Sequence, residues 1–191
     1  DVYQFRITRA GVPLTTYSVI PQLTIIQGEG TSSSSTATGY SFQRKTFYDG
    51  TNSRYWMLYH DGSQIDIRYS SDTGSNWTSI SALSYNTNDF SVWNKKIGST
   101  EYIWVAITDN YDTKILRGTL STSNITWDND IDSALNGAGS NDSYSYPYIS
   151  ADSANYLWVG ARYYDGTNYV YKTARSDATG DTDFSSLGWT S

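Results

Sequence analysis

The sequence predicts an all-β protein built from propeller blades, each a sheet of four antiparallel strands. Three observations support this prediction. Aromatic residues make up 16% of the 191-residue chain and are mixed with many Gly, Ser, Thr and Asn residues, and no long run shows helical periodicity. A strand motif also recurs as YWML at 55–58, YIWV at 102–105 and YLWV at 156–159. The unit spans about fifty residues, the length of one propeller blade.

The N-terminal part, residues 1–39, is predicted to form strands that belong to a partial blade or an arm. Residues 2–8 alternate as a strand, and residues 17–27 form another that Pro21 interrupts. The Ser/Thr-rich run that follows is typical of an exposed linker. An alternative is an arm that adds a strand to a neighbouring subunit.

Residues 40–191 are predicted to form three blades, at about 40–82, 88–130 and 144–191. In each blade a strand precedes the Trp-bearing strand, a polar turn such as Asp61-Gly62 follows it, and a further strand comes next. Three blades plus part of another do not close a ring. We therefore expect the ring to be incomplete, or to be completed by a longer parent chain or by another copy.

The loop after the first Trp-bearing hairpin carries the clearest motif. Ser70, Asp72, Gly74 and Trp77 fit the pattern Ser-x-Asp-x-Gly-x-x-Trp. In such a turn the Asp accepts backbone N–H groups, the Gly allows the reversal and the Trp packs the turn onto the sheet. This pattern resembles the Asp-box of sialidase-like (BNR) β-propellers, and the resemblance covers about residues 40–191.

The corresponding loops of the other two units are eroded copies of this motif. Residues 119–127 keep the final Trp and lack the Asp and the Gly. Residues 175–180 keep the start of the motif, but an insertion separates them from Trp189. One preserved turn and two eroded ones indicate a repeated structural element.

The resemblance to sialidases implies that arginines bind a carboxylate of the substrate and that a Tyr–Glu pair provides the nucleophile. Arg68, Arg117 and Arg175 recur at equivalent positions of the three units, which favours a structural role for them. Glu29 and Glu101 are the only glutamates, and neither has a tyrosine context that stands out. We therefore assign no catalytic residues.

Carbohydrate binding is the candidate function of a group of tyrosines in the third unit. Aromatic faces stack on sugars, while phenol hydroxyls form hydrogen bonds with the ligand or with water. The competing interpretation is that alternate tyrosines simply cover a half-solvated sheet. The candidates are Tyr163, Tyr164, Tyr169 and Tyr171.

Metal binding has one candidate, the run Asp128-Asn129-Asp130-Ile131-Asp132. Oxygen-rich loops with alternating Asp residues coordinate calcium, but Ser133 stands where an EF-hand-like loop has Gly. A solvated turn after the second blade is the favoured interpretation, with calcium as the only cofactor worth testing. The single histidine, His60, adjoins a turn and is predicted to be solvated.

Charge and composition narrow the class of protein. A net charge of −6 with 13 Lys and Arg argues against nucleic-acid binding, and no apolar run is long enough to cross a bilayer. The absence of Cys excludes a disulfide framework and a thiol nucleophile. The composition, rich in Tyr, Ser, Thr and Asn, is typical of an extracellular or cell- or virion-surface protein. N-glycosylation sequons begin at Asn76, Asn124 and Asn141.

These observations predict a non-enzymatic extracellular propeller module for structural assembly or for surface or carbohydrate recognition. Its expected partners are another copy or a longer parent chain, and glycans. One alternative is a segment of a sialidase-like glycoside hydrolase. Another is a virion or filament subunit with residues 1–39 as a linking arm.

Overall fold

The computed structural model describes residues 32–40, 42–184 and 187–190, without the side chains of residues 129–132. The predictions for residues 1–31 lie outside this range. The described residues form antiparallel sheets of four strands and contain no α-helix, which confirms the predicted all-β, propeller-like fold class. None of them belongs to a helix with the length and hydropathy that crossing a bilayer requires.

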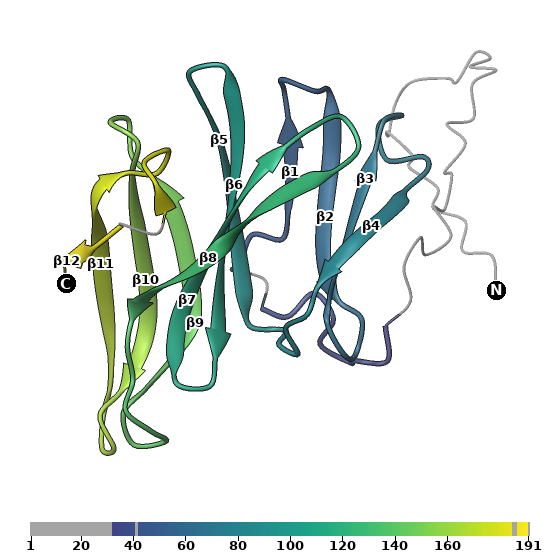
Figure 1. The fold of residues 1–191 in the computed structure, drawn as a ribbon. Coiled ribbons are helices and arrows are strands. Elements are labelled where there is room, and N and C mark those ends of the chain that lie inside the picture. The colour runs from purple at the N-terminus through teal and green to yellow at the C-terminus, as the bar shows by residue number, and fades with distance from the viewer. Residues whose placement is uncertain (1–31, 41, 185–186, 191) are drawn as a thin grey trace, which may run out of the picture.

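Each sheet is an up-and-down meander of four consecutive strands, which we call blades 1, 2 and 3. Blade 1 contains β1 (Thr46–Asp49), β2 (Arg54–His60), β3 (Ile65–Ser70) and β4 (Thr78–Leu83). Blade 2 contains β5 (Phe90–Ile97), β6 (Thr100–Asp109), β7 (Asp112–Leu120) and β8 (Ile125–Leu135). Blade 3 contains β9 (Ser143–Ala151), β10 (Tyr156–Tyr164), β11 (Tyr169–Thr179) and β12 (Trp189–Thr190). Figure 1 shows the blades side by side in chain order, with blade 2 in the middle.

The hairpin turns between the second and third strands of the blades use residues that tolerate a left-handed backbone. Gly62, Asn110 and Gly166 have φ values of 114°, 55° and 87°. Asp61 and Asp165 each accept two backbone N–H groups of their own turn, at 2.7 to 2.9 Å. Asp side chains therefore fix both turns, as the turn chemistry of the sequence indicates.

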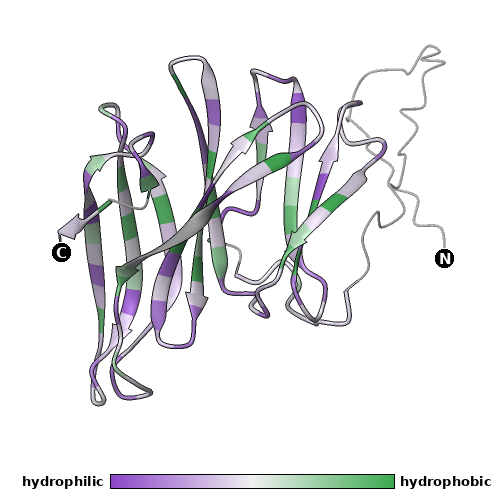
Figure 2. Ribbon diagram, viewed as in Figure 1, coloured by the Kyte–Doolittle hydropathy of each residue, from purple (hydrophilic) through white to green (hydrophobic). Residues whose placement is uncertain are grey.

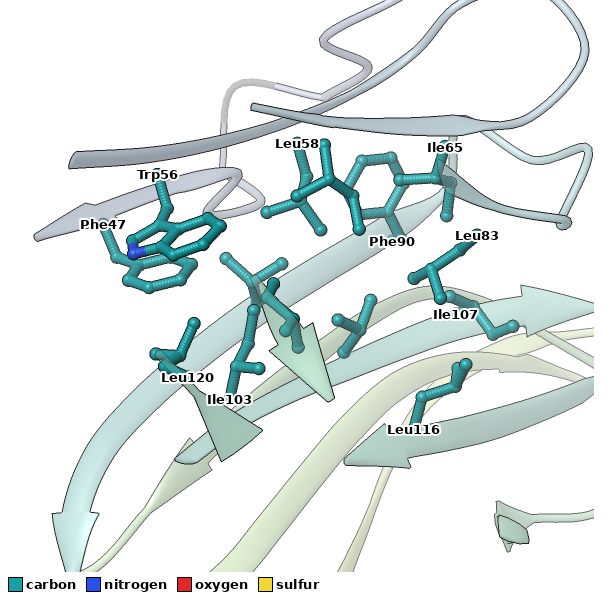
Figure 3. Packing of buried hydrophobic residues seen from close by; sticks show 14 residues of the cluster. Phe47, Trp56, Leu58, Ile65, Leu83, Phe90, Ile103, Ile107, Leu116 and Leu120 are labelled. Carbon is teal, nitrogen blue, oxygen red and sulfur yellow. The ribbon is translucent and has the colours of Figure 1, made fainter. Parts of the chain in front are cut away.

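Blade 1 packs on blade 2 through an apolar core (Figure 3). Trp56 and Phe47 stack with ring centroids 6.2 Å apart, and Ile103 and Leu120 of blade 2 belong to the same cluster. Figure 2 shows hydrophobic bands crossing the strands of all three sheets, as alternating residues require.

A second core joins blade 2 to blade 3, and β6 contributes to both cores. Ile103 and Val105 of β6 face blade 1, whereas Trp104 and Ala106 face blade 3. All four side chains are fully buried. A strand covered on both sides is continuously apolar, which explains why the second copy of the motif has the sequence YIWVAI.

The tryptophans of the repeated motif have different environments in the three blades. Trp56 and Trp104 are fully buried because the following blade covers them, whereas Trp158 of blade 3 is 42% exposed. Among the described residues no fourth sheet covers this side of blade 3. We call it the open face, and it includes Trp158, Gly160 and Arg162 on β10 with Arg175, Thr173 and Tyr171 opposite them on β11.

Three local predictions from the sequence are wrong. Residues 128–132 lie within strand β8, and residues 131 and 132 pair with Leu116 and Ile115 of β7, so the run does not form a solvated turn. His60 is only 7% exposed, and its Nε2 atom lies 2.9 Å from Asn86 Oδ1, so it is not a solvated turn residue. Arg68 lies opposite Met57 and is therefore not equivalent to the other two repeated arginines, which lie opposite tryptophans.

Candidate functional site

An aromatic hollow of about 400 Å³ lies on the open face of blade 3. Four aromatic rings and one guanidinium group line it, and three of the rings are more than a third exposed. Aromatic surface of this extent is a feature of ligand sites rather than of an ordinary protein exterior. The lining residues are Phe42, Tyr146, Tyr148, Arg162 and Tyr171.

A β-bulge in β9 places the side chain of Tyr146 in this hollow. Tyr146 has a φ of 57°, a left-handed conformation that is unfavourable for a bulky residue. The register between β9 and β10 shifts at this point, between Gly160 and Arg162. Bulges of this kind redirect side chains and are common beside functional sites.

Hydrogen bonds from blade 2 and from the segments before blades 1 and 2 hold the bulge in place. The backbone N–H of Tyr146 donates to Asp89 Oδ2 at 2.7 Å, and Thr108 Oγ1 donates to the same oxygen at 2.9 Å. Gln43 Nε2 donates to Asp89 Oδ1 at 2.7 Å and to the carbonyl oxygen of Pro147 at 3.2 Å. The buried carboxylate therefore connects the segment before blade 1 to the first strand of blade 3.

Lys45 lies beside this network and is almost completely buried. Its ammonium group donates to the carbonyl oxygens of Phe90 at 2.7 Å and Asn88 at 2.9 Å, and it lies 3.3 Å from the centroid of the Phe90 ring. Burial lowers the pKa of Lys45 to about 7, and attraction to Asp89 opposes the shift.

Arg162 is the charged group of the hollow. Its Nε atom donates to Ser145 Oγ at 3.1 Å, and its Cζ atom lies 4.3 Å from the centroid of the Tyr146 ring and 4.4 Å from that of Tyr169. Within the described part of the chain, Arg162 forms no ion pair, because the ion pairs there involve other cations. The guanidinium group is therefore oriented by its neighbours and can bind an acceptor from a ligand.

Tyr171 forms one wall of the hollow because the residue beside it has no side chain. A Cβ atom at Gly160 would lie 2.1 Å from the hydroxyl oxygen of Tyr171, so only glycine lets the ring lie across β10 in this position. The Tyr171 side chain is nevertheless 65% exposed. Its ring thus presents a face to solvent.

The four tyrosines predicted to bind carbohydrate do not form one surface. Tyr171 lines the hollow, and Tyr169 adjoins it through Arg162. Tyr164 stacks on Tyr169 with ring centroids 4.7 Å apart. Tyr163 lies on the opposite side of β10, where it packs against the core between blades 2 and 3.

The register of the blades contains a signal that could have identified the hollow. Trp104 pairs with Arg117, and Trp158 pairs with Arg175. Four residues further along the same hairpins, blade 2 has Thr108 opposite Thr113, and blade 3 has Arg162 opposite Tyr171. Small residues at an internal interface are thus replaced by large ones on the open face. Phe42, by contrast, lies before the first strand, and nothing in its sequence context marks it.

The turn of the preserved motif has a hydrogen-bond network centred on Asp72. Asp72 Oδ1 accepts the backbone N–H of Asn76 and the hydroxyl of Ser70, at 2.9 and 2.8 Å. Trp77 Nε1 donates to the carbonyl oxygen of Gly74 at 3.1 Å. Hydrogen bonds from Asn76, and then from Ser70, lower the pKa of Asp72 to about 2. These hydrogen bonds fix the backbone of the turn.

Replacing Ser70 by alanine is expected to lower the free energy of unfolding by about 1–3 kcal/mol, because the backbone N–H of Gly74 would lose its buried acceptor. The Ser70 hydroxyl is buried and accepts that N–H at 2.9 Å. Urea unfolding measures the change. The control is Ser63→Ala, which removes an exposed hydroxyl bound to Asp61. Equal losses for the two variants would contradict the role of Ser70.

The structure also places the sequon asparagines and part of the candidate metal site. Asn76, Asn124 and Asn141 are all exposed, but Asn76 Nδ2 already donates to Asp72 Oδ2 at 2.6 Å. Asp128 forms an ion pair with Arg117 at 2.5 Å. The side chains of Asp130 and Asp132 lie outside the description, so calcium binding there stays a prediction.

A second hollow, of about 420 Å³, lies where the end of β8 meets β12. It has no charged side chain in its lining and no cluster of aromatic faces. We therefore place the candidate site in the aromatic hollow. The residues that line the second hollow are Ser133, Ala134, Leu135, Asn136, Tyr144, Leu187, Gly188 and Trp189.

The fold and the site together define a propeller-like all-β protein with an aromatic, cationic hollow on its last blade. Comparison with protein-family models and with curated proteins finds no match. Among solved structures, the chain is similar to an endo-arabinase from Bacteroides thetaiotaomicron VPI-5482. The identity is 11%, the match covers 77% of this chain and 78% of the other, and the TM-score is 0.28. The assignment of the fold rests on the strand pairing described above.

Proposed function

We propose that the protein is a non-enzymatic extracellular module that recognises carbohydrate with the open face of blade 3. The observation that carries this proposal is the aromatic hollow of about 400 Å³. The exposed faces of Tyr148 and Tyr171 suit the C–H side of a sugar ring, and the guanidinium of Arg162 suits its oxygens. The bulge at Tyr146 orders these groups before a ligand arrives, which reduces the entropy lost on binding.

The register of blade 2 supports ligand binding over simple packing. Blade 2 has the fully buried Ser91 and Thr113 where blade 3 has Tyr148 and Tyr171. A sheet that packed on the open face as closely as blade 3 packs on blade 2 would collide with these rings. This half of the face is therefore better suited to a ligand that lies between the rings.

Replacing Tyr171 by alanine is expected to weaken polysaccharide binding by about ten-fold or more, because one wall of the hollow is lost. Affinity electrophoresis in gels containing dextran, xylan, galactan or polygalacturonate identifies the ligand and measures the loss. Gly160→Ala provides a second variant, which displaces the Tyr171 ring without removing it. Tyr55→Ala, which removes an exposed ring from blade 1, is the control. Failure to bind any of the four polymers would refute the proposal.

A second candidate function is structural assembly, in which another blade covers the open face. The observation that favours it is Trp158, whose counterparts Trp56 and Trp104 are covered by a neighbouring blade. Tyr55 is 40% exposed and occupies the position of Ile103, which belongs to the first core. A second copy could therefore supply the missing cover. The native mass in solution distinguishes a self-associating chain from a monomeric recognition module.

The relationship to sialidase-like propellers is also a proposal. It is supported by the turn of residues 70–77, in which Asp72 and Ser70 form the hydrogen bonds expected of an Asp-box. An extracellular or surface location would suit such a module. A hydrolase segment is the weaker alternative, since the buried Glu101 accepts hydrogen bonds from Thr51 and Asn94 and has no tyrosine partner among the described residues.

A further inference from the structure

Among the described residues, neither Arg162 nor Arg175 on the open face has a carboxylate partner, whereas Arg117, the equivalent of Arg175 in blade 2, has one. Arg117 pairs with Asp128, and it also donates to the carbonyl oxygens of Gly180 and Thr182 in blade 3. Arg175 occupies the same position opposite its tryptophan, but within the described residues it has neither an ion pair nor a hydrogen bond through its side chain. Within the described part of the chain, the side-chain hydrogen bond of Arg162 goes to the neutral hydroxyl of Ser145.

Each of these arginines lies against aromatic rings. The Cζ atom of Arg175 lies 4.7 Å from the ring centroid of Tyr156 and 5.9 Å from that of Trp158. Arg162 lies between Tyr146 and Tyr169 in the same way. Stacking keeps both guanidinium groups on the surface of the sheet, with their N–H groups available for a bidentate contact to an anionic group.

We call each arginine with its neighbouring rings a station: one station is Arg175 with Tyr156 and Trp158, and the other is Arg162 with Tyr146 and Tyr169. Both arginines lie on the same face of the hairpin formed by β10 and β11. Trp158 and Arg162 are separated by four residues along β10, which corresponds to about 13 Å at the rise of a β-strand. Gly160 and Thr173 lie between the stations, where the exposed ring of Tyr171 lies over Gly160, so a ligand that reaches both stations crosses this ring. One sugar ring is too short to reach both stations, whereas a linear chain lying along β10 contacts each of them.

We propose that the ligand of the open face is a linear anionic polysaccharide whose acidic groups bind Arg162 and Arg175. This inference rests on the carbohydrate-recognition function proposed above. The acidic group is a carboxylate or a sulfate ester, because either matches the fork of a guanidinium group. The rings beside each arginine contact the apolar faces of the sugars. Long-range attraction is not the cause of binding, since the chain has a net charge of −6.

Single-stranded nucleic acid also combines anionic groups with stacking rings, but the surface fits it less well. Such ligands carry a phosphate on every nucleotide and are bound by continuous basic grooves. The open face has two arginines without an ion-pair partner among the described residues, and the chain has only 13 Lys and Arg in total. We therefore favour an acidic polysaccharide over single-stranded nucleic acid.

The experiment compares polygalacturonate with the same polymer after methyl esterification, which removes the charge and keeps the sugar chain. We expect esterification to weaken binding by about ten-fold or more, measured by isothermal titration calorimetry. Dextran sulfate and unmodified dextran form a second matched pair, which tells a sulfate ligand from a carboxylate ligand. Equal affinity for the charged and neutral members of both pairs would overturn this inference and leave the proposed carbohydrate function intact.

Variants test whether both stations are used. Arg175→Gln and Arg162→Gln are each expected to weaken binding of the charged polymer by about ten-fold and to weaken binding of the neutral polymer less. Lys96→Gln removes an exposed cation from β5 and is the matched control. A charged disaccharide, which reaches one station, should respond to only one of the two arginine variants. If Arg175→Gln behaves like Lys96→Gln, the two-station geometry is wrong.

Two further outcomes would identify a different occupant. Binding of oligothymidylate that competes with polygalacturonate and depends on Arg175 would show a nucleic-acid site and overturn the proposal. Self-association that is lost in Trp158→Ala, with no polysaccharide binding, would show that a second copy covers the face. Thermal unfolding of every variant checks that a loss of binding does not come from a loss of the fold.

Discussion

Replacing Trp104 by alanine is expected to lower the free energy of unfolding by about 3–5 kcal/mol, the range for removing a large buried aromatic side chain. Trp104 is fully buried between blades 2 and 3. A Cβ atom built on Gly180 would lie 2.8 Å from its indole ring, so the neighbouring backbone packs directly on the tryptophan. The cavity left by the substitution would be enclosed by two sheets whose strands cannot move independently. Urea unfolding followed by circular dichroism measures the loss.

The matched control for this experiment is Trp158→Ala, which removes the same side chain from the same position of the next blade. Trp158 is 42% exposed and donates a hydrogen bond to Asp152 at 3.1 Å. Its removal should cost about 1 kcal/mol or less, in the range of surface substitutions. Similar losses for the two variants would mean that the blades do not pack as described. A large loss for Trp158→Ala alone would indicate that a partner covers the open face in solution.

This difference between two equivalent tryptophans shows what the sequence can and cannot reveal. The repeated motif predicted four-stranded sheets, because alternation and turn residues are local features. The motif does not reveal which faces are covered, since the sequences of residues 102–105 and 156–159 differ only in one aliphatic position. Exposure of Trp158 depends on the sheets that surround it. The error over β8 has a similar origin, because pairing with β7 outweighs the weak strand propensity of alternating Asp residues.

The candidate site was only partly predictable for the same physical reason. Tyr171 stood out because tyrosines are dense in blade 3, but Tyr163 points to the other side of β10 because the side chains of a strand alternate. Phe42 reaches the hollow from a segment about a hundred residues away, which no local pattern reveals. Arg162 could have been found by aligning the hairpins of blades 2 and 3, in which it replaces Thr108.

The titration of Lys45, in the buried network behind the hollow, should make the free energy of unfolding depend on pH. Lys45 is 6% exposed, and burial lowers its pKa to about 7, below its ordinary value of 10.5. Between these two values the unfolded chain binds a proton that the folded protein does not bind, so stability increases as pH rises. The neutral amine keeps two N–H groups, enough for the carbonyl oxygens of Phe90 and Asn88. Below pH 7 both states are protonated, and this contribution no longer changes.

Replacing Lys45 by methionine is therefore expected to remove a rise in stability of roughly 2–3 kcal/mol between pH 7 and pH 9, because one proton corresponds to about 1.4 kcal/mol per pH unit. Urea unfolding of the wild type and the variant at half-unit intervals measures the difference, in which contributions of other groups cancel. Measurements stop at pH 9 because burial raises the pKa of several tyrosines, including Tyr85 and Tyr144, and this lowers stability at higher pH. Lys96→Met, at an exposed position, should follow the wild-type slope. Parallel curves for Lys45→Met and the wild type would show that the ammonium group stays charged, with its hydrogen bonds and the Phe90 ring offsetting the cost of burial.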